Sequence, residues 1–123
     1  MTEKNDVIHD LLPLREPTFY ILLSLSSGEK HGYAILKEVE AHSTGRVQLS
    51  TGTLYEALAR LLDQDLIERV ESTNVEDPQD QHPGRPRKSY RLSLRGLHVL
   101  QAEADRLRQM VAVTQWLLSE ETG

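Results

Sequence analysis

The chain has 123 residues, of which 38% are hydrophobic and 5% aromatic, and it contains no cysteine. This length fits one small domain, or a small domain with an appended helix. The lack of cysteine excludes disulfides, thiolate zinc sites and a thiol nucleophile. The formal net charge of −5 by itself argues against a nucleic-acid partner. No segment resembles a signal peptide or a membrane span, so we expect a cytoplasmic protein.

The first half of the chain predicts three helices. An apolar run after a proline predicts a helix over residues 16–26, with a short helix before it through residues 7–12. GEKHG, which follows, is expected to be a loop. Apolar residues at helical spacing predict a second helix over residues 33–43, ended by Gly45 in the C′ position. Ser50 is a suitable N-cap for a third helix over residues 51–63.

The second half predicts a β-hairpin and a long helix. Alternating residues predict strands in DLIERVEST (65–73) and KSYRLS (88–93). Residues 74–87 between them are rich in proline and charge, so we expect a mobile loop. From Ser93 a heptad pattern predicts a helix of roughly 25 residues that pairs with a second copy of itself. The heptad residues are Leu97, Leu100, Ala104, Leu107, Val111, Thr114 and Leu118.

Three helices followed by a hairpin is the element order of a winged helix-turn-helix domain. In that arrangement the third helix enters the major groove of DNA, and the hairpin loop lies along the neighbouring groove. We therefore predict a mainly α fold with a small β-hairpin (α+β). A winged helix-turn-helix domain is expected at residues 1–92 and a dimerisation helix at residues 93–123.

The start of the third helix, STGTLY at residues 50–55, carries groups that suit DNA. Phosphate can bind a helix N-terminus because its backbone N–H groups are unsatisfied and the helix dipole favours anions. Glycine permits close approach, and the hydroxyl groups can reach phosphates or base edges. An ordinary N-cap explains this stretch equally well when it is taken alone.

A basic segment shifts the balance towards DNA. GRPRK at residues 84–88 places an Arg-Pro-Arg sequence on the hairpin tip, where it suits a narrow minor groove. A solvated, charged hairpin tip is the alternative. The position of the tip after a candidate recognition helix favours DNA binding, and we expect the loop not to be ordered without DNA.

Other kinds of site find little support. The five histidines lack the spacing of a metal site, and no sequence frame organises a catalytic triad. We therefore predict no enzymatic activity, no metal and no cofactor. Trp116, beside the heptad stripe, either packs in the dimer or forms the wall of an apolar ligand pocket between subunits.

Three stretches together resemble the PadR family of bacterial transcriptional regulators: FYILLSLSSGEKHGYAILKEVE (19–40), LSTGTLYEALARLLDQDLIE (49–68) and GRPRKSYRLSLRGLHVL (84–100). The resemblance implies a homodimeric winged helix-turn-helix repressor that dimerises through its C-terminal helix. It also implies a response to small aromatic or amphipathic ligands. The expected DNA contacts, including the capped helix start, are Tyr33, Ser50, Thr51, Gly52, Thr53, Tyr55, Arg60, Arg85, Arg87 and Lys88.

One stretch departs from the pattern of that family. Glu56 and Ala59 stand where similar sequences often carry basic residues, and only Arg60 remains. Fewer phosphate contacts predict weaker non-specific binding and a shallower salt dependence.

We therefore expect a sequence-specific DNA-binding regulator. Its form would be a homodimeric repressor on a roughly palindromic operator, released by a small hydrophobic or aromatic ligand. The alternative is a winged-helix protein-interaction adaptor with weak or lost DNA binding, which the acidic balance and Glu56 favour.

Overall fold

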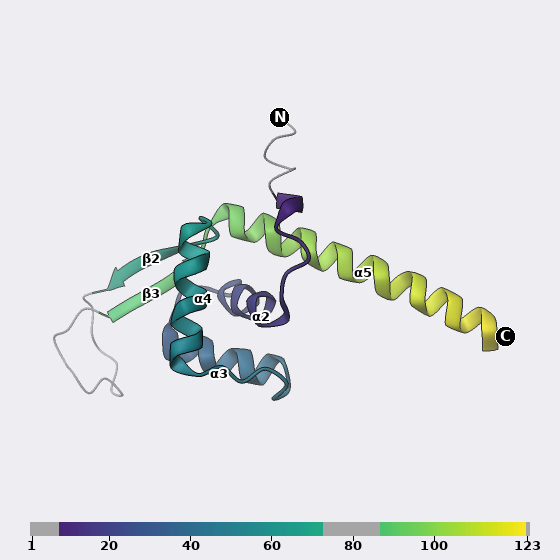
Figure 1. The fold of residues 1–123 in the computed structure, drawn as a ribbon, viewed down its shortest axis with the longest axis horizontal. Helices are drawn as coiled ribbons and strands as arrows, with labels where there is room; N and C mark the ends of the chain where they lie inside the picture. The colour runs from purple at the N-terminus through teal and green to yellow at the C-terminus, as the bar shows by residue number, and fades with distance from the viewer. Residues whose placement is uncertain (1–7, 73–86, 123) are drawn as a thin grey trace.

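The computed structural model of the protein describes residues 8–72 and 87–122 (Figure 1). Residues 8–10 are helical and lead into the first long element. The described helices are α2 (Glu16–Leu25), α3 (Gly32–His42), α4 (Thr51–Asp63) and α5 (Leu94–Thr122), and the strands are β1 (Lys30–His31), β2 (Ile67–Ser72) and β3 (Arg87–Leu92).

The predicted fold is confirmed: a mainly helical chain with a small antiparallel sheet. The bounds of α4 match the prediction, and α2 ends one residue early. Ser50 caps α4 as expected, because its side chain accepts a hydrogen bond from the Thr53 amide. The long C-terminal helix is also present, and its second half projects beyond the rest of the molecule (Figure 1).

The end of α3 differs from the prediction by one residue. Thr44, not Gly45, occupies the C′ position, with a φ of 51°. The Thr44 amide donates to the Ala41 carbonyl at 3.1 Å, and the Gly45 amide donates to the Glu40 carbonyl at 2.8 Å. These two bonds form a Schellman motif, in which Gly45 lies one position further on. Gly45 therefore correctly indicated where α3 ends, but the C′ residue of the turn is Thr44.

The end of α4 has the same geometry and explains why β2 starts late. Asp65 has a φ of 60°, and the Leu66 amide donates to the Leu61 carbonyl at 3.0 Å. Both residues are therefore part of a Schellman turn. The strand expected from Asp65 begins instead at Ile67.

The sheet contains a strand that the sequence pattern did not indicate. The described strands lie in the order β1-β3-β2, so β3 is central. The expected loop GEKHG contains β1, which pairs antiparallel with β3 through Lys30 opposite Tyr90 and His31 opposite Ser89. A strand of two residues is too short to show an alternating pattern. This pairing joins the start of α3 to the wing hairpin formed by β2 and β3.

The hydrophobic core draws on both the helices and the sheet, and the start of α5 belongs to it. Val99 is fully buried and Leu100 is 6% exposed, in one cluster with residues of α2, α3 and α4. Gly96 lies so close to the turn before β2 that a β-carbon there would overlap the Leu66 carbonyl oxygen. The domain boundary predicted at residue 92 stays a prediction, and α5 shares the core of the preceding domain over its first turns.

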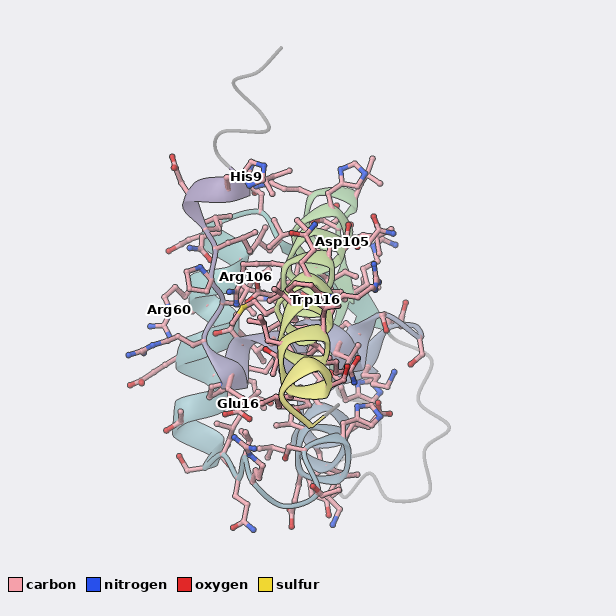
Figure 2. The ribbon with its side chains drawn as sticks, turned by 90° about the vertical axis from the view of Figure 1, so that its right-hand side faces the viewer. His9, Glu16, Arg60, Asp105, Arg106 and Trp116 are labelled. Carbon is pink, nitrogen blue, oxygen red and sulfur yellow. The ribbon has the colours of Figure 1, made fainter. Side chains whose placement is uncertain are left out.

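The buried carboxylate of Glu103 on α5 holds the N-terminal segment to that helix. The Glu103 side chain is 2% exposed and accepts hydrogen bonds from Arg106 Nε at 2.6 Å and from the Leu14 amide at 2.9 Å. Arg106 extends from α5 towards the N-terminal segment (Figure 2). The Arg106 hydrogen bonds, and then the Leu14 amide, hold the pKa of Glu103 below its usual range although burial opposes them.

We expect Glu103→Gln to lower the free energy of unfolding at neutral pH by about 1–3 kcal/mol, the cost of losing hydrogen bonds to a buried charged group. The Glu103 pKa is lower in the folded state. Its stabilisation is therefore present above the unfolded pKa of the carboxyl group and is lost as the pH falls through the folded pKa. Urea unfolding of the wild type and Glu103→Gln at neutral and acidic pH measures this difference in the free energy of unfolding.

The matched control is Asp105→Asn, on the same helix, which alters an exposed ion pair with Arg108. We expect that change to have little effect at either pH. Equal losses of stability in the two variants would contradict the assignment of Glu103 as the anchor.

Candidate nucleic-acid interface

The N-terminal end of α4 presents hydrogen-bond donors to solvent. Thr51, Gly52 and Thr53 are all exposed. The Ser50 hydroxyl accepts from the Thr53 amide at 3.1 Å and donates to Thr53 Oγ1 at 3.0 Å, so the Thr53 hydroxyl keeps its own hydrogen for another acceptor. The first turn of α4 carries no acidic residue. The positive end of its dipole is therefore not neutralised within the helix.

The outward side of α4 beyond its first turn is acidic. Leu54, Ala57, Leu58 and Leu61 are buried on one side of the helix. The opposite side carries an exposed ridge, which we call the acidic ridge: Gly52, Glu56, Ala59 and Asp63, at spacings of four, three and four residues.

Arg60 stands beside the acidic ridge rather than on it. Its side chain is exposed and extends outward from α4 (Figure 2). It also lines a small hollow of about 160 Å³ together with Arg15 and Gln64. Because it lies in the third turn, Arg60 is well removed from the groups at the helix start, and the structure does not bring it together with Thr51 and Thr53.

The described part of the wing carries three exposed cationic side chains: Arg69 on β2, and Lys88 and Arg91 on β3. Lys88 lies on β3 and is exposed, opposite Glu71 of β2 in the strand register. The backbone of Arg87 begins β3. Arg85, the side chain of Arg87 and the expected mobility of loop 74–87 lie outside the described residues, so these expectations stay predictions.

A cation on α3 was missed by the sequence reasoning. Tyr33 is 63% exposed, and Lys37 Nζ lies 5.7 Å from the centre of its ring in a cation–π contact. Tyr33 is the last residue of the HGY motif and Lys37 is four residues further on, a spacing that places the two side chains on one helix face. The first helix of a helix-turn-helix crosses the DNA backbone, so Lys37 joins Tyr33 as a candidate phosphate contact.

Tyr55 and Tyr90 connect α4 to the wing. Tyr55 is 45% exposed, whereas Tyr90 on β3 is 2% exposed. Burial, and secondarily the neighbouring Tyr55, raise the pKa of Tyr90, while Arg69 acts in the opposite direction. Tyr90 therefore stays neutral in the sheet. Beside it, Ser89 Oγ lies 3.0 Å from His31 Nδ1, and the His31 side chain makes no cap hydrogen bond to α3.

The heptad residues of α5 fall into two groups. Leu100 is buried in the core of its own chain, and the others near it are partly buried. Val111 is 53% exposed and lies on the projecting half, as does Trp116, which is 59% exposed. The partly buried heptad residues are Leu97, Ala104 and Leu107, and the exposed ones are Val111, Thr114 and Leu118.

In the part of the chain that the structure describes, no group of three or more histidine, aspartate or glutamate side chains is arranged to hold a metal ion. No helix within those residues combines the length and apolar character that crossing a bilayer requires.

A family model described as the transcriptional regulator PadR-like family matches residues 21–102. The chain belongs to this family. The match extends from α2 to the first turns of α5, so it covers the helix-turn-helix, the wing and the anchored start of the C-terminal helix. Transcription regulation is the function of the family.

Solved structures of PadR proteins share this fold. A PadR family transcription regulator from Clostridium difficile is 26% identical, with a TM-score of 0.65 over 85% of this chain and 99% of that chain. A PadR-like regulator from Bacillus cereus is 23% identical, with a TM-score of 0.64 over 92% and 96% of the two chains.

A third structure contains DNA. It is Bacillus subtilis PadR in complex with operator DNA, 23% identical, with a TM-score of 0.58 over 72% of this chain and 47% of that chain. No significant match is found among curated proteins.

Proposed function

We propose that this chain is a homodimeric repressor that binds a roughly palindromic operator. The observation that carries the proposal is the grouping of hydroxyl, aromatic and cationic side chains at the start of α4 and on the elements beside it. Thr51, Thr53, Lys37 and Lys88 are exposed there, around a helix end whose dipole attracts phosphate. The similarity of fold to a PadR protein whose structure contains operator DNA supports the same reading.

The acidic ridge limits how α4 can approach DNA. Glu56 and Asp63 would be repelled by phosphates if the helix lay flat along the backbone. An approach that leads with the N-terminal end keeps the acids further from the backbone and brings Thr51 and Thr53 to the groove first. We infer that α4 enters the groove end-on, and that the wing and α3 provide the phosphate contacts.

Dimerisation through α5 is supported by the apolar side chains on its projecting half. Residues 111–119 of this helix are all exposed in the single chain. Val111 and Leu118 continue the heptad pattern, and Met110, Trp116 and Leu117 add further apolar surface. A second copy would remove this surface from water and would present two α4 helices to one side of the DNA.

We also propose that a small hydrophobic or aromatic ligand releases the repressor from DNA. Trp116 offers an exposed ring on the projecting half of α5. A hollow of about 460 Å³ lies between the N-terminal turn and α5, next to the Glu103–Arg106 ion pair, and is lined in part by Leu12, Ala102 and Arg106. A ligand there would act on the segment from which α5 leaves the domain.

Selection from a random-sequence duplex library tests the function directly. We expect the protein to enrich duplexes with two related half-sites in inverted orientation, centred about 34 Å apart or a multiple of it. Failure to enrich any sequence would contradict operator binding and would favour the alternative, a winged-helix protein-interaction adaptor.

A charge substitution on the wing tests the phosphate contacts. We expect Lys88→Gln to weaken binding to the selected duplex and to a random duplex by similar factors. The slope of log affinity against log salt should decrease by about one for each protomer. Arg108→Gln, on the exposed side of α5 and paired with Asp105, is the control that should leave the slope unchanged. An unaltered slope in Lys88→Gln would remove β3 from the interface.

Two matched valines test which face of α5 forms the proposed dimer interface. Val111 is 53% exposed and lies on the heptad stripe, whereas Val113 is 52% exposed and lies outside it. We expect Val111→Glu to convert the dimer to a monomer and to abolish tight operator binding, because it buries an unpaired charge in the interface. Val113→Glu should remain dimeric. Sedimentation velocity and gel shift measure both properties, and a dimeric Val111→Glu would place the interface elsewhere.

A further inference from the structure

The beginning of α3 lies directly against the second turn of α4. A β-carbon built on Gly32 would be only 2.5 Å from the Tyr55 hydroxyl oxygen and 3.0 Å from the ring carbon that carries it. Such distances are too short for a real contact, so any side chain at position 32 would force the tip of the Tyr55 ring to move. The tip of the Tyr55 ring thus packs directly against the backbone of Gly32.

The need for glycine at this position is one of space. Gly32 is the first residue of α3 and is buried, and its φ lies outside the positive range that favours glycine. Any residue can adopt its backbone conformation. What position 32 provides is the missing side chain, which leaves room for the ring of Tyr55.

The same junction is bonded to the wing. Gly32 follows His31, whose Nδ1 lies 3.0 Å from Ser89 Oγ and 3.4 Å from the Lys88 carbonyl oxygen. Next to Ser89 is the buried Tyr90, and Tyr55 is near enough to contribute, after burial, to the raised pKa of Tyr90. The ring of Tyr55 therefore lies where the start of α3, the second turn of α4 and the central strand of the sheet meet.

We propose that Tyr55 is a positioning residue: its ring, packed against Gly32, sets the separation between the N-terminal end of α4 and strand β3. This inference rests on the DNA-binding function proposed above. A winged-helix domain contacts two adjacent grooves at the same time. A change in the separation of α4 and the wing therefore loses contact at one groove or the other.

The two sequence motifs HGY and GTLY thereby act as a pair. Gly32 comes from the first and Tyr55 from the second, and they are in contact although 23 positions separate them. Tyrosine suits this role because its ring is large and rigid, and few torsion angles must be fixed to hold it. Its half-exposed edge can still face DNA while the tip of the ring holds α4 in place.

A double-mutant cycle separates positioning from direct contact. The variants are Tyr55→Ala, Lys88→Gln and the two combined, measured on the duplex selected by the wild-type protein. If Tyr55 positions α4 against the wing, Lys88→Gln weakens binding about threefold less in the Tyr55→Ala background, since the wing contact is already impaired. Independent direct contacts would instead give additive losses, and additive losses overturn the proposal.

A second test changes Gly32, the residue against which the Tyr55 ring packs. We expect Gly32→Ala to displace the Tyr55 ring and to weaken binding to the selected duplex roughly tenfold, a size usual for coupled residues, with a much smaller effect on a random duplex. Adding Tyr55→Phe removes the closest clashing atom and should restore part of the lost affinity. No recovery, or equal loss on both duplexes, would count against the proposal.

Folding is checked separately. Near-ultraviolet circular dichroism and thermal unfolding are recorded for each variant. Gly52→Ala serves as the matched control for stability only, since no protein atom other than its chain neighbours and helix backbone lies within 4 Å of a β-carbon there. If Gly32→Ala does not fold, the Tyr55–Lys88 cycle decides the matter alone.

The two proposals fail in different ways. If the wild-type protein enriches no duplex, the proposed DNA-binding function is wrong. If the wild-type protein binds its selected duplex and the cycle is additive, only the positioning role of Tyr55 is wrong.

Discussion

The contact between the Leu66 turn and the start of α5 is the constraint on which the rest of the structure depends. The Leu66 carbonyl accepts a hydrogen bond from the Ser93 amide at 3.1 Å, and Ser93 Oγ donates to the Asp65 carbonyl at 2.7 Å. Gly96 permits this approach because it has no side chain. The turn thus ends α4, begins the wing and fixes the direction in which α5 leaves the domain. The hydrogen bond from the Leu14 amide to Glu103 then holds that direction two turns further along.

This geometry links the proposed recognition of DNA by α4 to the proposed dimerisation through α5. The end of α4 is hydrogen-bonded to the start of α5 through the turn at Leu66. In the proposed dimer, the spacing between the two α4 helices would therefore follow from how the two α5 helices cross. A ligand that shifts the anchored part of α5 would change this spacing without touching the DNA-facing side chains. The acidic ridge on α4 makes DNA binding depend more strongly on this spacing. Because the ridge repels phosphates, only the N-terminal end of α4 is suited to the groove, so the orientation of that end matters more.

The sequence predicted the elements well where periodicity and capping act locally. The leucines of α4, its Ser50 cap and the heptad pattern of α5 each involve residues within a turn or two of one another, so the bounds could be predicted closely. The strand β1 and the true C′ residue Thr44 were missed. Two residues show no period, and a non-glycine residue with positive φ is stabilised by its surroundings rather than favoured by its own conformational preference. Lys37 could have been found from its spacing to Tyr33.

The amino-acid order alone determined the family, the helices and the types of side chain at the start of α4, because composition, spacing and caps are local properties. Only the tertiary structure decided how those side chains are used. It brought Gly32 of one motif under Tyr55 of another, placed Glu56 on the outward ridge, and divided the heptad stripe between the core of its own chain at Leu100 and exposed surface at Val111. Each of these depends on the packing of elements far apart in the chain, which no local pattern encodes.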